Sequence, residues 1–121
     1  MQRRDEHAEQ CALVRWAQIQ AHRRPEIGLL YAIPNGGRRD AVTGARLRAE
    51  GVRPGVPDLC LPWPSGKWHG LYIELKAPGG RASPAQRWWI ERLTVAGYRA
   101  DVCVGWEAAA RLIMDYLGGK E

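Results

Sequence analysis

One apolar run constrains the fold of this chain more than any other segment: Gly-Leu-Tyr-Ile-Glu-Leu-Lys-Ala at residues 70–77. Its alternation predicts a strand, one face of which carries Leu71, Ile73 and Leu75. The opposite face carries Tyr72, Glu74 and Lys76. A strand this apolar belongs in the centre of a sheet, where unpaired charges are costly. The acid and the base on this strand therefore need partners.

Periodicity and turn residues predict the remaining elements. An amphipathic helix is expected at residues 5–21, and further helices are expected at residues 43–50, 83–96 and 106–117. Further strands are expected at residues 29–33, 58–61 and 98–104. Ser83 and Pro84 give the third helix a cap and a favourable first residue. Because no internal repeat interrupts this order, one layered α/β domain is predicted over residues 1–121.

The composition is that of a folded protein with a preference for polyanions. Of the 121 residues, 45% are hydrophobic and 26% are charged, which is far from the signature of disorder. An excess of Lys and Arg gives a net charge of +5, which favours a partner such as nucleic acid. No apolar run could span a bilayer, and the N-terminus lacks the apolar stretch of a signal peptide. A cytoplasmic protein with no membrane partner is therefore expected.

The three cysteines predict neither a disulfide framework nor a zinc site. Cys11, Cys60 and Cys103 are odd in number and widely spaced, and no pair of histidines has ligand spacing. We expect all three thiols to be small core residues.

Asp58 and the Glu74-Leu75-Lys76 triplet form the constellation with the most chemistry. Asp58 opens one strand of a predicted hairpin, and its partner strand carries the acid and the base. Neighbouring strands lie about 4.8 Å apart, so both carboxylates could surround one hard cation. Two carboxylates this close repel each other unless a divalent ion lies between them. The long turn leaves the register open, and an ordinary cross-strand salt bridge remains the alternative.

If a cation is bound there, Lys76 has a clear task. An ammonium beside the cation can orient the attacking water or stabilise charge on a phosphate, which indicates metal-dependent phosphodiester hydrolysis. The first helix could add a carboxylate, either Glu6 at the edge of its apolar stripe or Glu9 inside the stripe. One carboxylate on the apolar side of this helix is expected to point towards the rest of the protein. Gln86 could add a polar contact.

Four spaced motifs carry a family resemblance. Pro57-Asp58 followed by Glu74-Leu75-Lys76 resembles the bipartite motif of the PD-(D/E)xK nuclease superfamily. More narrowly, the chain is similar to the VRR-NUC family, the virus-type replication-repair nuclease domain. The motifs are Ile33-Pro34-Asn35-Gly36-Gly37-x-Arg39, residues 50–58, Tyr72-Ile73-Glu74-Leu75-Lys76 and Ser83-Pro84-x-Gln86. The likeness runs from Glu6 to Leu117.

The resemblance implies a restriction-endonuclease-like core, with a mixed central four-stranded sheet flanked by helices, and a site for Mg²⁺ or Mn²⁺. The implied metal ligands are the side chains of Glu6, Asp58 and Glu74 and the carbonyl of Leu75. It also implies that Lys76 is the catalytic lysine and that Gln86 lies near the scissile phosphate. Glu9 is the reserve for Glu6.

The same resemblance implies DNA as the partner. Stand-alone members of this size are similar to phage-encoded dimeric Holliday-junction resolvases, so branched DNA and a homodimer are expected. One short chain presents one active site, and symmetrical cutting of two strands needs two copies. The candidate DNA contacts are Asn35, Arg38, Arg39 and Arg53. The alternatives are a flap, restriction-type or tRNA-processing nuclease and a non-catalytic DNA-binding module, although the complete set of acids and lysine disfavours the latter.

The tryptophans leave two questions open. Trp88 and Trp89, beside Gln86, could stack on unpaired bases or divide between core and interface. Trp63 and Trp68 flank the hairpin turn and could mark a dimer surface or a DNA wedge.

Overall fold

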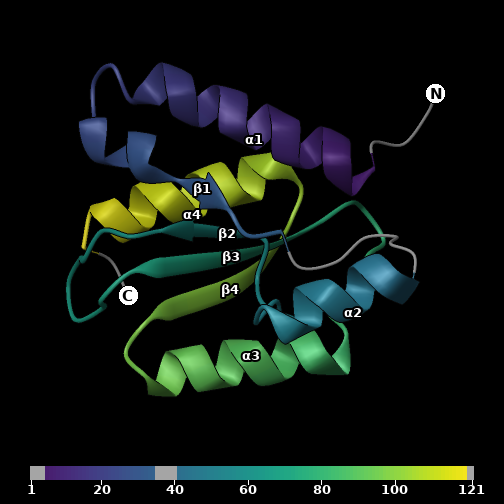
Figure 1. The fold of residues 1–121 in the computed structure, drawn as a ribbon. Helices are drawn as coiled ribbons and strands as arrows, with labels where there is room; N and C mark the ends of the chain where they lie inside the picture. The colour runs from purple at the N-terminus through teal and green to yellow at the C-terminus, as the bar shows by residue number, and fades with distance from the viewer. Residues whose placement is uncertain (1–4, 35–40, 120–121) are drawn as a thin grey trace.

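A four-stranded mixed sheet organises the chain in the computed structural model, which describes residues 5–34 and 41–119 (Figure 1). The strand order is β1-β2-β3-β4, with antiparallel β1–β2 and β2–β3 pairs and a parallel β3–β4 pair. The strands are β1 (Tyr31–Ala32), β2 (Leu59–Leu61), β3 (Leu71–Lys76) and β4 (Arg99–Val104). The helices are α1 (Glu6–Gln20), α2 (Ala41–Ala49), α3 (Pro84–Val95) and α4 (Trp106–Leu117). The predicted α/β class with a mixed four-stranded sheet is confirmed.

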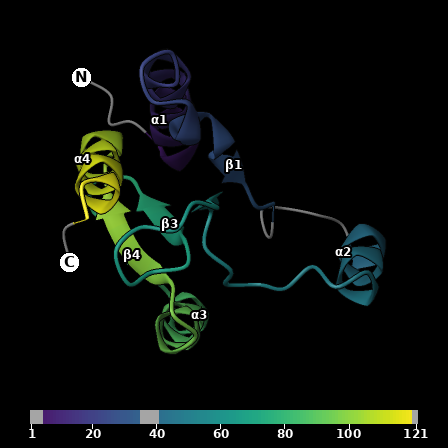
Figure 2. The same ribbon diagram turned by 90° about the vertical axis from the view of Figure 1, so that its left-hand side faces the viewer.

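The strand β3 divides the sheet into a core face and a polar face, as its alternation predicts. Leu71, Ile73 and Leu75 are buried in the core, which α1 and α4 complete on the same side of the sheet. Figure 2 shows α1 and α4 on one side and α3 on the other. The polar residues of β3 therefore face away from the helical core.

Helix α2 differs from the other helices. It has no buried residue and stands apart from the sheet in Figure 2. It begins two residues before the predicted start of this helix, at Ala41 instead of Thr43. No helix among residues 5–34 and 41–119 is long and apolar enough to cross a membrane.

The strand predicted at residues 29–33 is wrong over its first half. Residues Pro25–Leu29 form a 3-10 helix, η1, and only Tyr31–Ala32 pair with β2. Pro25 fixes the backbone for a helical turn, and the Leu30 amide donates a hydrogen bond of 3.1 Å to the Ile27 carbonyl. The backbone of residues 29–30 therefore belongs to the 3-10 helix and its cap, and the strand begins at Tyr31.

The prediction that all three thiols are core residues is also wrong in part. Cys60 and Cys103 are buried, but Cys11 is exposed. Successive residues of a helix are about 100° apart, so Cys11 lies on the side of α1 away from its buried neighbours Glu9 and Leu13. A thiol at this position gains little from burial.

Candidate active site

The register of β2 and β3 brings the two predicted acids together. Leu59 lies opposite Ile73, and the same antiparallel register continued by one residue sets Asp58 opposite Glu74. Asp58 is fixed there because its Oδ2 accepts a hydrogen bond of 2.8 Å from the Leu75 amide. The sequence left this register open, and the structure puts both carboxylates at one end of the hairpin.

Glu74 is a buried acid with incomplete compensation. It is only 1% exposed, and its Oε1 has no hydrogen-bond partner in the structure. Burial, the negative charge of Asp58 and a hydrogen bond with it raise the pKa of Glu74 to about 8, although Lys76 opposes the rise. The carboxylates of Asp58 and Glu74 therefore repel each other, and one bound proton or one cation between them would relieve this repulsion.

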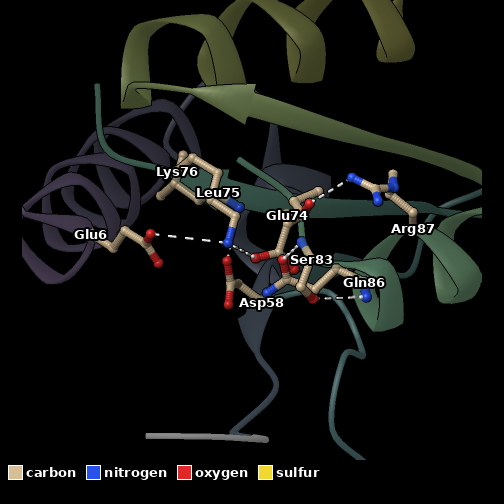
Figure 3. Close-up of polar contacts among 9 residues, drawn as sticks. Glu6, Asp58, Glu74, Leu75, Lys76, Ser83, Gln86 and Arg87 are labelled. Carbon is tan, nitrogen blue, oxygen red and sulfur yellow. Dashed lines mark hydrogen bonds and ion pairs between the residues drawn. The ribbon is translucent and has the colours of Figure 1, made fainter. Parts of the chain in front are cut away.

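Lys76 lies between two acids that come from different elements (Figure 3). Its Nζ is 3.4 Å from Oε2 of Glu74 and 4.0 Å from Oε2 of Glu6 at the start of α1. The lysine is buried, whereas the side chain of Glu6 is 53% exposed. The amine of Lys76 is thus held beside the acidic cluster, which consists of Asp58 and Glu74.

The loop after β3 covers the stem of Lys76. Gly79 adopts a φ of +88°, a backbone conformation that residues with a side chain rarely adopt, and lets the chain turn back. A Cβ at Gly80 would lie 3.3 Å from Cβ of Lys76, so the backbone approaches the lysine closely. Both glycines were missed by sequence reasoning, and the Pro-Gly-Gly run directly after the lysine was their signal.

The donor set fits a divalent cation in part. Asp58 and Glu74 supply hard carboxylate oxygens, and the unpartnered Glu74 oxygen is a buried acceptor that a cation would satisfy. Within the described residues, however, no three His, Cys, Asp or Glu side chains gather as a metal cage. Glu6 instead faces the ammonium of Lys76.

Gln86 has a structural task at the start of α3. Its Oε1 accepts a hydrogen bond of 2.8 Å from the Ser83 amide, and Ser83 Oγ accepts one of 3.2 Å from the Gln86 amide. This reciprocal pair is a capping box, which satisfies two backbone donors at the helix start. Of its side chain, only the amide NH₂ then remains for a phosphate. The predicted Ser83 cap is confirmed, and the Ser-x-x-Gln spacing was the signal for the box.

The predicted DNA contacts are not all in the described part of the chain. Asn35, Arg38 and Arg39 lie outside the described residues. Arg53 is exposed in the segment before Asp58, where its guanidinium lies over the ring of Trp89 at 5.5 Å from the centroid.

Glu9, the reserve acid, faces the protein as predicted but serves another helix. It is 3% exposed, and its Oε1 accepts a hydrogen bond of 2.9 Å from the Trp106 amide at the start of α4. The residue before that helix is Gly105, which supplies no side-chain cap. Glu9 thus replaces the missing cap across 97 positions of sequence. A helix that begins after glycine was the signal for such a distant partner.

This contact predicts different effects for the two acids of α1. Glu9→Ala should lower the free energy of unfolding by about 1–2 kcal/mol, because the first turn of α4 loses its acceptor. Glu9→Gln keeps an oxygen at this position and should lose less. Urea denaturation measures both values. Glu6→Ala is the control, since its half-exposed carboxylate should cost under 1 kcal/mol.

Asp58, directly before β2, and Glu74 and Lys76 on the neighbouring β3 thus bring two carboxylates and a buried lysine together in a mixed α/β sheet. The sequence profile of the VRR-NUC domain matches residues 2–107. A solved VRR_NUC domain protein is similar to this chain with a TM-score of 0.84 and 30% identity, over 99% of this chain and 93% of that one. A search of curated proteins finds no match. The chain belongs to the VRR-NUC domain family, and its function is therefore of the nuclease type, in DNA processing.

Proposed function

We propose that this protein is a metal-dependent endodeoxyribonuclease that hydrolyses phosphodiester bonds at the Asp58, Glu74 and Lys76 cluster. The observation that carries the proposal is the buried Glu74 carboxylate, which shares one end of a hairpin with Asp58 and contacts a buried lysine. A fold has no structural need for two acids at such a position, because their repulsion destabilises it. Side chains arranged at an energetic cost of this kind are typical of functional sites.

The residues that would hold Mg²⁺ or Mn²⁺ are Asp58 and Glu74, with the Leu75 carbonyl and Glu6 as further ligands. When bound, the cation would neutralise charge on the phosphate and make water a better nucleophile. The Glu74 oxygen that lacks a partner supports this assignment, as does the hard-oxygen character of the set.

Lys76 would act on the reacting phosphate and its water. Its Nζ is held at 3.4 Å from Glu74, so it is preorganised to stabilise negative charge that develops on the phosphate. Gln86 would offer its amide NH₂ to a phosphate oxygen, since the capping box uses its carbonyl oxygen.

The substrate that we propose is branched DNA, such as a Holliday junction, cut by a homodimer in the cytoplasm. The positive net charge supports binding to a phosphate backbone, which is salt-sensitive and largely independent of base sequence. Within residues 5–34 and 41–119, a chain offers one acid-lysine cluster of this kind, so paired cuts in two strands need two copies. Light scattering of the protein bound to a junction should therefore give the mass of one junction plus two chains, and one chain per junction would remove this part of the proposal.

A panel of labelled substrates tests the activity. A four-way junction, a flap, a linear duplex and RNA are each incubated with Mg²⁺, with Mn²⁺ and with EDTA. We expect cleavage of branched DNA in the presence of either ion and none in EDTA. Binding to all DNAs without cleavage would instead indicate a non-catalytic DNA-binding module. Preference for the flap or the duplex would indicate the alternative nuclease classes.

A further inference from the structure

A pocket separate from the acidic cluster lies between the loop at residues 51–57 and helix α3. Its volume is about 260 Å³, and its lining residues are Arg53, Pro54, Ala85, Trp88 and Trp89. None of these lining residues is acidic, and two are tryptophans. The acidic cluster does not use any of these side chains.

The two walls of the pocket are fixed to each other. Gly55 has a φ of +91°, and a Cβ there would lie 2.9 Å from the Ala85 backbone. The loop and α3 therefore pack so closely that no side chain fits at this position. Trp89 Nε1 also donates a hydrogen bond of 3.1 Å to the Pro54 carbonyl. The pocket is therefore preformed rather than assembled by a ligand.

The tryptophans present a stacking surface. Trp88 is 50% exposed, which excludes a core role, and its ring meets that of Trp89 at 5.5 Å and 87°. The guanidinium of Arg53 lies over Trp89, and that of Arg92 lies 5.8 Å from the centroid of Trp88. Arg92 also contacts the exposed Glu91 at 3.6 Å, a surface pair of little energy. An aromatic surface edged by guanidinium groups results.

These features match one class of ligand, a flat aromatic group attached to anions. Pockets for drug-sized ligands begin at roughly 300 Å³, so this smaller pocket suits a single ring system. A nucleobase stacks on aromatic side chains, and its flanking phosphates complement arginine. Both walls of the pocket are close in sequence to residues of the proposed active site. Arg53 lies five residues before Asp58, and Ala85 and Trp88 lie on either side of Gln86.

We propose that this pocket takes one unpaired base of the DNA substrate, stacked on Trp88, while Arg53 and Arg92 contact the phosphates beside it. The inference rests on the proposed function and deepens it, since it specifies branched DNA in which a base is unpaired at the branch point, next to the duplex that is cut. Bases in a duplex are stacked on each other and would not reach the pocket. The selectivity for branched DNA would then come in part from this contact.

Base-dependent binding tests the proposal. A labelled duplex with a single-stranded arm is compared by fluorescence anisotropy in EDTA with the same DNA whose arm carries abasic nucleotides, which keep the phosphates. The full-length protein should bind the natural arm roughly five-fold or more tightly than the abasic arm. Trp88→Ala should abolish this difference, Trp88→Phe should retain part of it, and neither should change binding to a fully paired duplex. Trp63→Ala, at another exposed tryptophan, should keep the difference.

The outcomes separate this proposal from the proposed function. If the protein cleaves branched DNA with Mg²⁺ but binds both arms equally, the base pocket is refuted and the nuclease proposal stands. If it neither binds nor cleaves any DNA, both are refuted. If Trp88→Ala changes the mass measured by light scattering while the base preference persists, the pocket is a contact between copies and not a base site. Circular dichroism confirms that each variant is folded.

Discussion

Replacement of Lys76 by alanine should lower the rate of DNA cleavage by roughly 10²–10⁴-fold, the range for loss of one group that acts in a transition state. The ammonium is buried and held between Glu74 and Glu6, so no mobile surface lysine can replace it. Single-turnover cleavage of a labelled junction at saturating protein measures the chemical step. Wild-type turnover in Lys76→Ala would refute the catalytic assignment.

The binding arm of this experiment separates catalysis from affinity. Lys76→Ala should bind a junction with nearly the wild-type dissociation constant in EDTA, because most affinity for DNA comes from many backbone contacts. Lys67→Ala is the matched control, since Lys67 is exposed in the β2–β3 turn and lies over Trp68. This variant should cleave at the wild-type rate. Equal losses in Lys67→Ala and Lys76→Ala would indicate an effect of net charge alone.

The sequence predicts those parts of the site that depend on local pattern. The alternation from Leu71 to Lys76 is enough to assign the strand, its core face and the shared face of Glu74 and Lys76, because side chains alternate in any strand. The pairing of Asp58 with this face depends on the length and path of the β2–β3 turn. Periodicity carries no information about that path, so the register had to come from the structure.

The roles of Glu9 and Gln86 that sequence reasoning missed both lie at helix starts. Glu9 is within the apolar stripe of α1, but its role follows from Gly105, the residue before α4, which supplies no side-chain cap. Gln86 could be placed near the site from its position after the lysine strand, yet its side-chain oxygen is engaged by Ser83. In both cases a backbone donor at a helix start attracts the side chain, because such donors have no partner within the helix.

Replacement of Glu74 by glutamine should abolish cleavage and also change how the stability of the metal-free protein depends on pH. The pKa of Glu74 rises from the ordinary 4.5 to about 8 in the fold, chiefly through burial and the charge of Asp58. Between these values the folded protein binds a proton that the unfolded chain releases. The stabilisation is therefore complete below pH 4.5 and is lost as pH rises through 8. Glutamine is neutral throughout and should remove this loss.

Denaturant unfolding in EDTA at pH 5 and pH 9 measures the difference. From pH 5 to pH 9 the wild-type free energy of unfolding should fall by several kcal/mol more than that of Glu74→Gln, because Glu74 in the fold must lose its proton over this range. Glu91→Gln, which changes an exposed carboxylate, should follow the wild type. Added Mg²⁺ should restore wild-type stability at pH 9, because a ligand that binds only the folded state stabilises it, and should not affect Glu74→Gln. Parallel pH profiles for the wild type and Glu74→Gln would show that Glu74 carries no buried charge to relieve.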